Sequence, residues 1–184
     1  MKHSKAYLQQ LRHALDALDL RLVEDMCEQF AAARERDAQF FLCGNGGSGA
    51  TASHLANDLG KGASLDQARR FRVIALTDNV PWMTALANDI SYDVIFAEQL
   101  RNLARPGDVL LAISGSGNSA NVIQAVEAAK ELGVETIGWT GFGGGKLAQL
   151  ADRSIIVDSH HMGRVEDIHT ILMHLVCYYF MEEV

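Results

Sequence analysis

Two apolar runs in this chain each lead through a glycine-rich turn into a segment with helical periodicity. The run at 109–113 (VLLAI) enters the loop 114–119 (SGSGNS), and apolar residues then recur with the period of a helix. A strand, a tight turn and a helix start in this order direct backbone N–H groups and the positive end of the helix dipole to one point. Three hydroxyl groups, those of Ser114, Ser116 and Ser119, surround that point. The pattern predicts a site for a phosphate monoester on a neutral sugar.

A second loop repeats this arrangement earlier in the chain. The apolar run at 40–43 enters the loop 44–48 (GNGGS), and a helix is predicted near 49–59. The loop is neither a Walker loop nor a GxGxxG motif, because no GK[ST] follows and the glycine spacing differs. Either loop alone is also compatible with an ordinary turn, in which glycine permits tight geometry and serine caps the helix. Two such loops in one small chain favour phosphate binding.

Strands and helices alternate along most of the chain. The expected strands are 39–43, 72–76, 109–113, 136–139 and 154–157, and the expected helices lie near 49–59, 81–87, 92–103, 119–132, 145–151 and 165–183. This order predicts an α/β fold with a mostly parallel sheet and helices on both faces. Ligands bind such sheets at the carboxyl ends of the strands, where both loops lie. The segment 141–145 either lines that site or is a plain loop.

Apolar residues at helical spacing predict a helical segment over residues 4–36, with a break near Leu18 and Asp19. The stripe is long for a helix that covers only its own small domain. We therefore expect residues 1–36 to pack against another protomer. A length of 184 residues suits a single domain, 1–184.

Charge and composition disfavour several classes of protein. The formal net charge is −7 and no basic run is present, which argues against a nucleic-acid partner. No apolar run approaches the roughly 20 residues of a membrane span, and no signal peptide is predicted. Cys27, Cys43 and Cys177 are odd in number and irregularly spaced, which indicates reduced thiols in a cytoplasmic protein.

Candidate metal ligands occur on two predicted helices. His54 and Asp58 are four residues apart, so both lie on one helix face and can share a divalent ion; a polar helix face is the alternative interpretation. His174 interrupts the apolar half of the last helix, where a lone histidine is more often a hydrogen-bonded core residue than a ligand. Glu166 precedes His174 by about 12 Å along a straight helix, whereas Asp167 shares the face of His174 more closely. Spacing alone does not choose between these two carboxylates.

Together these pieces resemble the sugar isomerase (SIS) domain family, and most of all its phosphoheptose isomerases. The matching stretches are 43–48, 54–58, 74–78, 87–89, 113–122, 140–146 and 164–174. The serine-rich loop is shared across SIS domains, whereas its combination with the loop 44–48, His54 and His174 is much narrower. The resemblance implies a flavodoxin-like αβα sandwich with a five-stranded parallel sheet. It also implies a homotetramer with sites between subunits.

The resemblance further implies an aldose–ketose isomerase that interconverts sedoheptulose 7-phosphate and D-glycero-D-manno-heptose 7-phosphate, usually for lipopolysaccharide heptose synthesis. Its implied substrate-binding residues are Asn45, Gly46, Gly47, Ser48, Asp78, Ser114, Gly115, Ser116, Ser119 and Glu166. Its implied ligands to a zinc ion are His54, Asp58, Glu166 and His174. Asp58 and His174 would move the protons. Manganese, iron or cobalt would also suit such chemistry.

Several positions depart from the family pattern. The family usually has Glu where this chain has Asp58, Gln at Glu166 and Asp at Gly163. It has arginine at position 62, for which Lys61 is the nearest substitute. These changes bear on the identity of the sugar more than on the reaction, so an isomerase of a different sugar phosphate is an alternative.

A non-catalytic SIS protein is the rival from another class. One related branch binds a replication initiator protein as a tetramer. Such a scaffold needs neither a base nor a metal, so a candidate residue at all four ligand positions favours an enzyme. A SIS transcription regulator is disfavoured, because no helix-turn-helix segment accompanies the domain.

Overall fold

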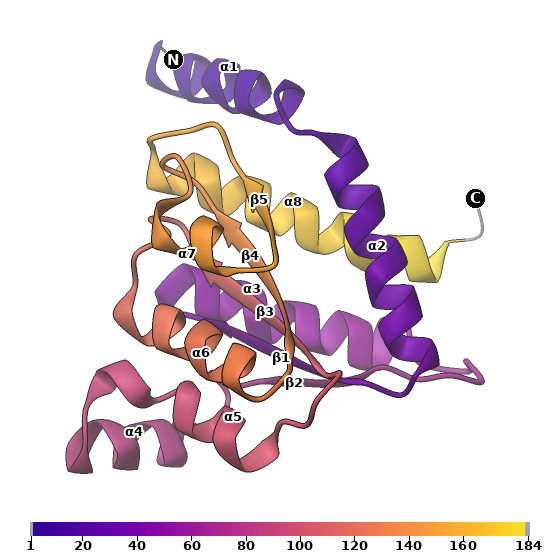
Figure 1. Ribbon diagram of the computed structural model, residues 1–184. Helices are drawn as coiled ribbons and strands as arrows, with labels where there is room; N and C mark the ends of the chain where they lie inside the picture. The colour runs from indigo at the N-terminus through magenta and orange to yellow at the C-terminus, as the bar shows by residue number, and fades with distance from the viewer. Residues whose placement is uncertain (1, 183–184) are drawn as a thin grey trace.

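A five-stranded parallel sheet lies between two layers of helices in the computed structural model, which describes residues 2–182 (Figure 1). The strands are β1 (Gln39–Gly44), β2 (Arg72–Ala75), β3 (Val109–Ser114), β4 (Glu135–Thr140) and β5 (Arg153–Ile156), and their order in the sheet is β2-β1-β3-β4-β5. All four neighbouring pairs are parallel. The predicted α/β sandwich is confirmed, and each expected strand is present with its ends within one residue of the prediction.

The sheet is covered by helices that join its strands and by helices that precede the first strand or follow the last. They are α1 (Lys2–Asp16), α2 (Leu20–Glu35), α3 (Gly46–Asn57), α4 (Val80–Asp89), α5 (Ala97–Leu103), α6 (Ala120–Glu131), α7 (Gly145–Leu150) and α8 (Met162–Met181). A π-helical turn, η1 (Asp58–Gly62), and a 3₁₀ turn, η2 (Tyr92–Val94), complete the set. Among the described helices, none is both long and apolar enough to cross a membrane.

Three predicted helices differ from the observed ones. The helix expected at 49–59 begins at Gly46 and widens at Asp58, where the carbonyl accepts from the Ala63 N–H at 2.8 Å, five residues on. The helix expected at 92–103 is two pieces: the turn η2, which the Ser91 hydroxyl caps, and α5, which begins at Ala97. The helix expected at 165–183 begins three residues earlier, and position 183 lies outside the described residues.

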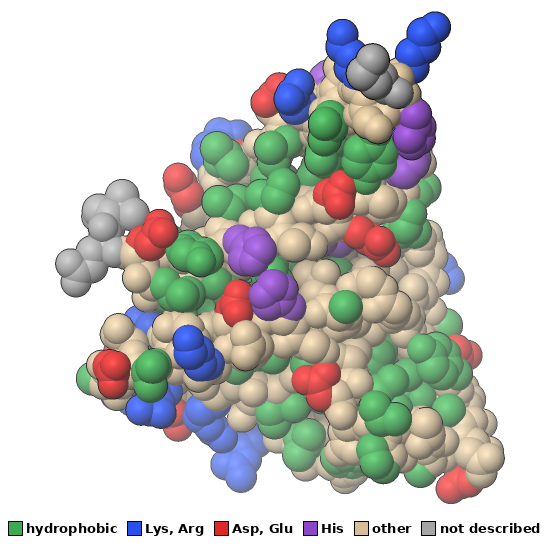
Figure 2. Space-filling model, turned by 180° about the vertical axis from the view of Figure 1, so that it is seen from behind, with side chains coloured by type: hydrophobic (Ala, Val, Ile, Leu, Met, Phe, Trp, Pro, Cys, Tyr) green, Lys and Arg blue, Asp and Glu red, His purple; other side chains and the backbone are tan. Residues whose placement is uncertain are grey.

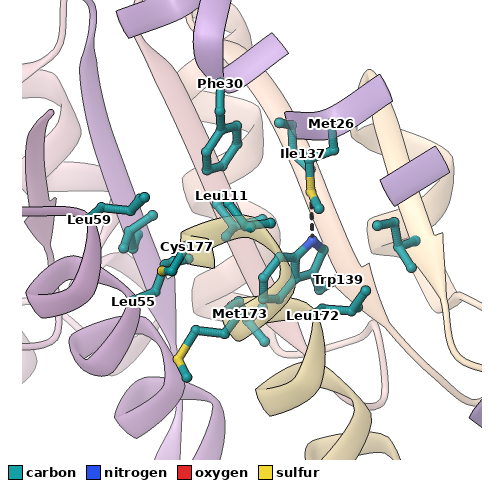
Figure 3. Packing of buried hydrophobic residues seen from close by; sticks show 14 of the residues in the cluster. Met26, Phe30, Leu55, Leu59, Leu111, Ile137, Trp139, Leu172, Met173 and Cys177 are labelled. Carbon is teal, nitrogen blue, oxygen red and sulfur yellow. Dashed lines mark hydrogen bonds between the residues drawn. The ribbon is translucent and has the colours of Figure 1, made fainter. Parts of the chain in front are cut away.

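Core side chains alternate between the two faces of the central strands. In β1, Phe40 and Leu42 point to the layer of α2, α3 and α8, whereas Phe41 and Cys43 point to the layer of α5, α6 and α7. Trp139 of β4 is fully buried in the first layer and donates its indole N–H to the Met26 sulfur at 3.2 Å (Figure 3). Each large side chain buried in this way contributes roughly 1.5–3 kcal/mol.

The N-terminal segment breaks where the sequence predicts. Asp19 caps α2 by accepting the Arg21 N–H at 3.0 Å, so α1 and α2 are separate helices that meet at an angle (Figure 1). α2 buries five residues against the sheet, whereas Ala14 is the sole buried residue of α1. α1 is fastened instead by the Tyr7 hydroxyl, which donates to Asp167 on α8 at 2.6 Å.

The three cysteines are free and buried, in agreement with the prediction of reduced thiols. Burial raises the pKa of Cys27 to about 11 and the pKa of Cys43 to about 12. Burial likewise raises the pKa of Cys177 to about 12, with smaller contributions from Asp58 and Cys27. Thiols of this kind act as small apolar core residues at neutral pH.

Candidate active site

The two glycine-rich loops meet in one cavity of about 260 Å³ at the carboxyl ends of β1 and β3. We call this cavity the loop pocket; its lining residues are Asn45, Gly46, Gly47, Ser48, Ile113, Ser114, Gly115, Ser116, Ser119, Met162 and Glu166. All the predicted substrate-binding residues except Asp78 are in this set. Asp78 is exposed and accepts a hydrogen bond from Ser53 on α3.

The loop pocket contains two helix N-termini that carry no side-chain cap among the described residues. Asn45 and Ser119 occupy the N-cap positions of α3 and α6, yet neither side chain bonds to the first turn of its helix. The Ser119 hydroxyl pairs with the Ser114 hydroxyl at 3.0 Å instead. Because the first N–H groups of a helix need acceptors, both helix starts can receive the oxygen atoms of an anion.

Gly117 gives the serine-rich loop its shape. Its φ is +66°, in the left-handed region that favours glycine. A Cβ atom at this position would lie 2.0 Å from the Gly144 carbonyl oxygen. The Gly117 carbonyl in turn accepts the Leu147 N–H at 2.9 Å. The segment 141–145 therefore supports the loop from behind, and none of its residues lines the loop pocket.

Glu166 places a carboxylate over the loop 44–48. A Cβ atom built on Gly47 would lie 2.8 Å from Glu166 Oε1, so the absence of a side chain at Gly47 permits this approach. Asp167, the alternative left open by spacing, is bound to the Tyr7 hydroxyl instead. The carboxylate of Glu166 faces the loop pocket, where it opposes the field of the two helix starts.

His54, Asp58 and His174 form a second group, in which one donor atom from each residue lies within 4.8 Å of the others. The His54 Nε2 atom is 3.3 Å from Asp58 Oδ2, and the His54 and His174 rings meet edge to face at 5.3 Å. We call this group the triad. The side chain of His54 is 48% exposed and that of Asp58 is 21% exposed. Figure 2 shows adjacent histidine side chains with an acidic neighbour on an open surface of the molecule.

Two nitrogen donors and one oxygen donor at these distances could hold a divalent metal ion with an open coordination position. Among the described residues Glu166 is not part of the triad. His174 also lines a groove of about 520 Å³ between α2 and α8, whose other lining residues are mostly apolar. The triad therefore sits between the body of the chain and an open, largely apolar surface.

α3 and α8 connect the loop pocket to the triad. Gly47 and Glu166 approach each other near the starts of the two helices, and His54 and His174 approach each other two turns further on. The helices thus run in the same direction from one group to the other. The interval from Gly47 to His54 is seven residues and that from Glu166 to His174 is eight, which correspond to about 10 and 12 Å of helix axis.

Three further residues beside the site were not predicted from the sequence. Tyr92 and Asn121 both bind the Asn45 side chain. Tyr7 meets the start of α8, where a Cβ on Gly163 would lie 3.0 Å from the Tyr7 hydroxyl oxygen. The position of Asn121 at the start of a helix after a serine-rich loop is a weak signal in the sequence, whereas Tyr7 and Tyr92 carry none.

Comparison with known proteins agrees with this arrangement of fold and site. A family model described as the SIS domain matches residues 5–141. A probable phosphoheptose isomerase of Thermoplasma acidophilum is 37% identical over 174 residues, with 95% of each chain covered. The phosphoheptose isomerase of Rhodospirillum rubrum is 45% identical over 146 residues, which cover 79% of this chain and 77% of that protein.

A solved structure of a phosphoheptose isomerase from Neisseria gonorrhoeae superimposes with a TM-score of 0.90. It is 32% identical, and 97% of each chain is covered. Fold and loops define a SIS domain protein of the class that acts on phosphorylated sugars. Within that class, the chain belongs to the phosphoheptose isomerase family and is a phosphosugar isomerase.

Proposed function

We propose that the protein interconverts sedoheptulose 7-phosphate and D-glycero-D-manno-heptose 7-phosphate. The names of its relatives support this substrate. The observation that carries the proposal is the arrangement of an anion-binding pocket and a histidine–carboxylate triad along the same two helices. A scaffold protein would need only the first of these.

The separation of the two groups supports a seven-carbon substrate. A phosphate at Ser48 lies about 9 Å along the helix axis from the level of His54. A heptose has six C–C bonds of about 1.5 Å, so its extended chain and phosphate reach on the order of 10 Å. With the phosphate in the loop pocket, C1 and C2 would lie beside the triad. Binding energy at the phosphate would then orient the reacting carbons.

The loop pocket would hold the phosphate by hydroxyl and backbone N–H groups. Ser48, Ser114, Ser116 and Ser119 would donate hydroxyls, and the glycines at 46, 47 and 115 would leave room for close approach of the backbone. Asn45, Asp78 and Glu166 would contact the sugar. Asp78 would reach it only through a movement of the segment after β2 or from a neighbouring subunit.

Asp58 and His174 are proposed to transfer the protons. One group removes the proton from C2 of the aldose, which gives an enediol or enediolate, and that proton returns at C1. The other group moves the hydrogen of the C2 hydroxyl to the C1 oxygen. The C1 aldehyde thereby becomes an alcohol and C2 becomes a ketone, so the reaction needs no external oxidant or reductant.

The triad is proposed to hold a divalent metal, zinc, because imidazole and carboxylate donors at these distances suit that ion. Glu166 is proposed as a fourth ligand, from its own chain after a side-chain movement or from a neighbouring subunit. The ion, when bound, would polarise the substrate carbonyl and stabilise negative charge on its oxygen. Manganese, iron and cobalt suit the same donors.

We further propose a cytoplasmic homotetramer that serves lipopolysaccharide heptose synthesis, with residues 1–184 as one domain. Exposed leucines on the N-terminal segment support its place in a subunit interface: Leu8, Leu15, Leu20 and Leu22 are 36–59% exposed. Free cysteines support a reducing compartment. Binding to membranes or nucleic acids is not part of the proposal.

The test is incubation of purified protein with sedoheptulose 7-phosphate, after chelation and after return of zinc, with the aldose detected by NMR. Conversion that is lost on chelation and restored by zinc supports the proposal. Absence of conversion in both states rejects this substrate. A screen of pentulose, hexulose and heptulose phosphates then distinguishes another sugar phosphate from a protein that only binds, for which no ketose phosphate would react.

A further inference from the structure

Asn45 occupies an N-cap position but does not cap its helix. Its backbone is extended, with φ −106° and ψ 149°, as at an ordinary N-cap. An asparagine there usually accepts an N–H from the first turn. Here the carboxamide turns away from α3 and bonds to Asn121 on the first turn of α6. The N–H groups at the start of α3 stay open towards the loop pocket.

Asn45 and Asn121 form a reciprocal amide pair beside the pocket. Asn45 Nδ2 donates to Asn121 Oδ1 at 2.8 Å, and Asn121 Nδ2 donates to Asn45 Oδ1 at 2.8 Å. Asn121 is only 2% exposed, so its amide is held in a protected setting where hydrogen bonds are required. The pair joins the starts of α3 and α6, the two helices whose first turns open into the pocket.

Tyr92 completes the hydrogen bonding of the Asn45 oxygen. Its hydroxyl donates to Asn45 Oδ1 at 3.0 Å from the turn η2. A side-chain carbonyl has two acceptor positions and an amide NH₂ has two donor hydrogens. In Asn45 both acceptor positions and one hydrogen are therefore used by the protein. One N–H remains free.

We propose that Tyr92 and Asn121 are positioning residues of the sugar-phosphate site. They hold the Asn45 carboxamide so that it presents one N–H donor to an oxygen atom of the ligand. They also keep its own oxygen from capping α3. The ligand class rests on the proposed function, whereas the arrangement of the donor does not depend on turnover.

Removal of the Tyr92 hydroxyl should weaken ligand binding through Asn45 alone. Tyr92 is 53% exposed, so Tyr92→Phe should not disturb the core. Loss of one neutral hydrogen bond that orients a donor corresponds to about a three- to tenfold rise in the dissociation constant. In the enzyme assay this should appear as a rise in KM, with kcat changed by less than about twofold.

The experiment is a double-mutant cycle with Tyr92→Phe, Asn45→Ala and both changes together. Dissociation constants are measured by calorimetry for sedoheptulose 7-phosphate and for inorganic phosphate. We expect Tyr92→Phe to weaken at least one ligand by about three- to tenfold in the wild-type background. The same change should have less than about a twofold effect when Asn45 is already alanine, because the two residues act as one unit.

Tyr179→Phe is the matched control. Tyr179 is 48% exposed, and its hydroxyl makes no hydrogen bond within residues 2–182, so this change should leave both dissociation constants as they are. Equal effects of Tyr92→Phe in both backgrounds, or no effect in either, would overturn the proposal. A coupled effect on binding without any isomerisation would support the positioning role and reject only the proposed reaction.

Discussion

The loop pocket and the triad are built on opposite principles. The pocket is made largely of the backbone at two helix starts and of short side chains with hydroxyl groups. Hydrogen bonds within the chain fix its shape. The triad consists of His54 from α3, Asp58 from η1 and His174 from α8, and the His54 side chain is half-exposed. The proposed phosphate site is thus preorganised, whereas the proposed reacting centre would gain its final order from an ion, a substrate or a partner.

The sharpest test of this difference is His174→Ala in the triad. Because His174 belongs to neither core cluster, we expect an unchanged fold and phosphate affinity. Loss of a proton-transferring group should lower kcat at least about 100-fold. Kinetics, thermal unfolding and phosphate calorimetry on the same preparation measure the three quantities. Activity near that of the wild type would remove His174 from the mechanism.

In contrast to His174→Ala, the pocket variant Gly117→Ala should change the stability of the fold and the affinity for phosphate. A Cβ there meets the Gly144 carbonyl at 2.0 Å in a left-handed backbone, so the variant should lose at least about 2 kcal/mol of unfolding free energy and much of its phosphate affinity. Gly107→Ala is the control, because Gly107 has φ +88° with nothing within 4 Å of a Cβ. Denaturant titration should show a cost of only about 1 kcal/mol for the control. Equal costs would mean that backbone strain alone matters.

Acid should lower the stability of α8, the helix that carries residues of both the pocket and the triad. His169 lies on α8 between Glu166 and His174, and its Nε2 is 3.4 Å from the Thr140 carbonyl oxygen. Burial lowers the pKa of His169 from 6.5 to about 4. The native state therefore excludes a proton that the unfolded chain accepts below pH 6.5. The contribution of His169 to the free energy of unfolding is complete above pH 6.5 and should fall by roughly 2–3 kcal/mol by pH 4.

The control for this pH dependence is His169→Gln, which keeps an N–H donor and does not titrate. Denaturant titrations between pH 7 and pH 4 should show a shallower decline in unfolding free energy for the variant than for the wild type. Parallel declines would assign the acid sensitivity to carboxylates elsewhere.

The smallest expected effect concerns the one charge that lines the pocket. Glu166→Gln removes a carboxylate that faces the phosphate site, and removal of such repulsion near the surface is worth about 1 kcal/mol. We expect inorganic phosphate to bind about fivefold more tightly, with the gain reduced at high salt. Weaker binding in calorimetry would instead indicate that Glu166 contributes through a hydrogen bond or a ligand bond.

The fold could be predicted from local patterns because β1 and β3 are apolar runs and the other strands contain shorter ones. The start of α3 at Gly46 was missed, since glycine is a poor helix former and Gly46–Ser48 reads as loop. In the site, the glycines and serines of the two loops predict the pocket, because these residues act through the local backbone. The roles of Glu166 and Asp167 could not be separated, as adjacent helical residues differ by about 100° and only packing fixes that rotation.

Contacts between distant segments account for the remainder. The partners of Asn45 lie 47 and 76 residues away in the sequence, and Tyr7 lies 160 residues from Asp167. No sequence pattern around these residues indicates that they contact one another. Likewise, the departure from the family at Gly163 became understandable only when the structure placed the Tyr7 hydroxyl beside it.

The Tyr7–Asp167 hydrogen bond also has a consequence for the order of events during synthesis. The ribosome delivers Tyr7 160 residues before its acceptor on α8. During that interval α1, which buries only Ala14, lacks the hydrogen bond that fastens it to α8. We therefore expect α1 to settle on the domain later than the strands that follow it in the chain.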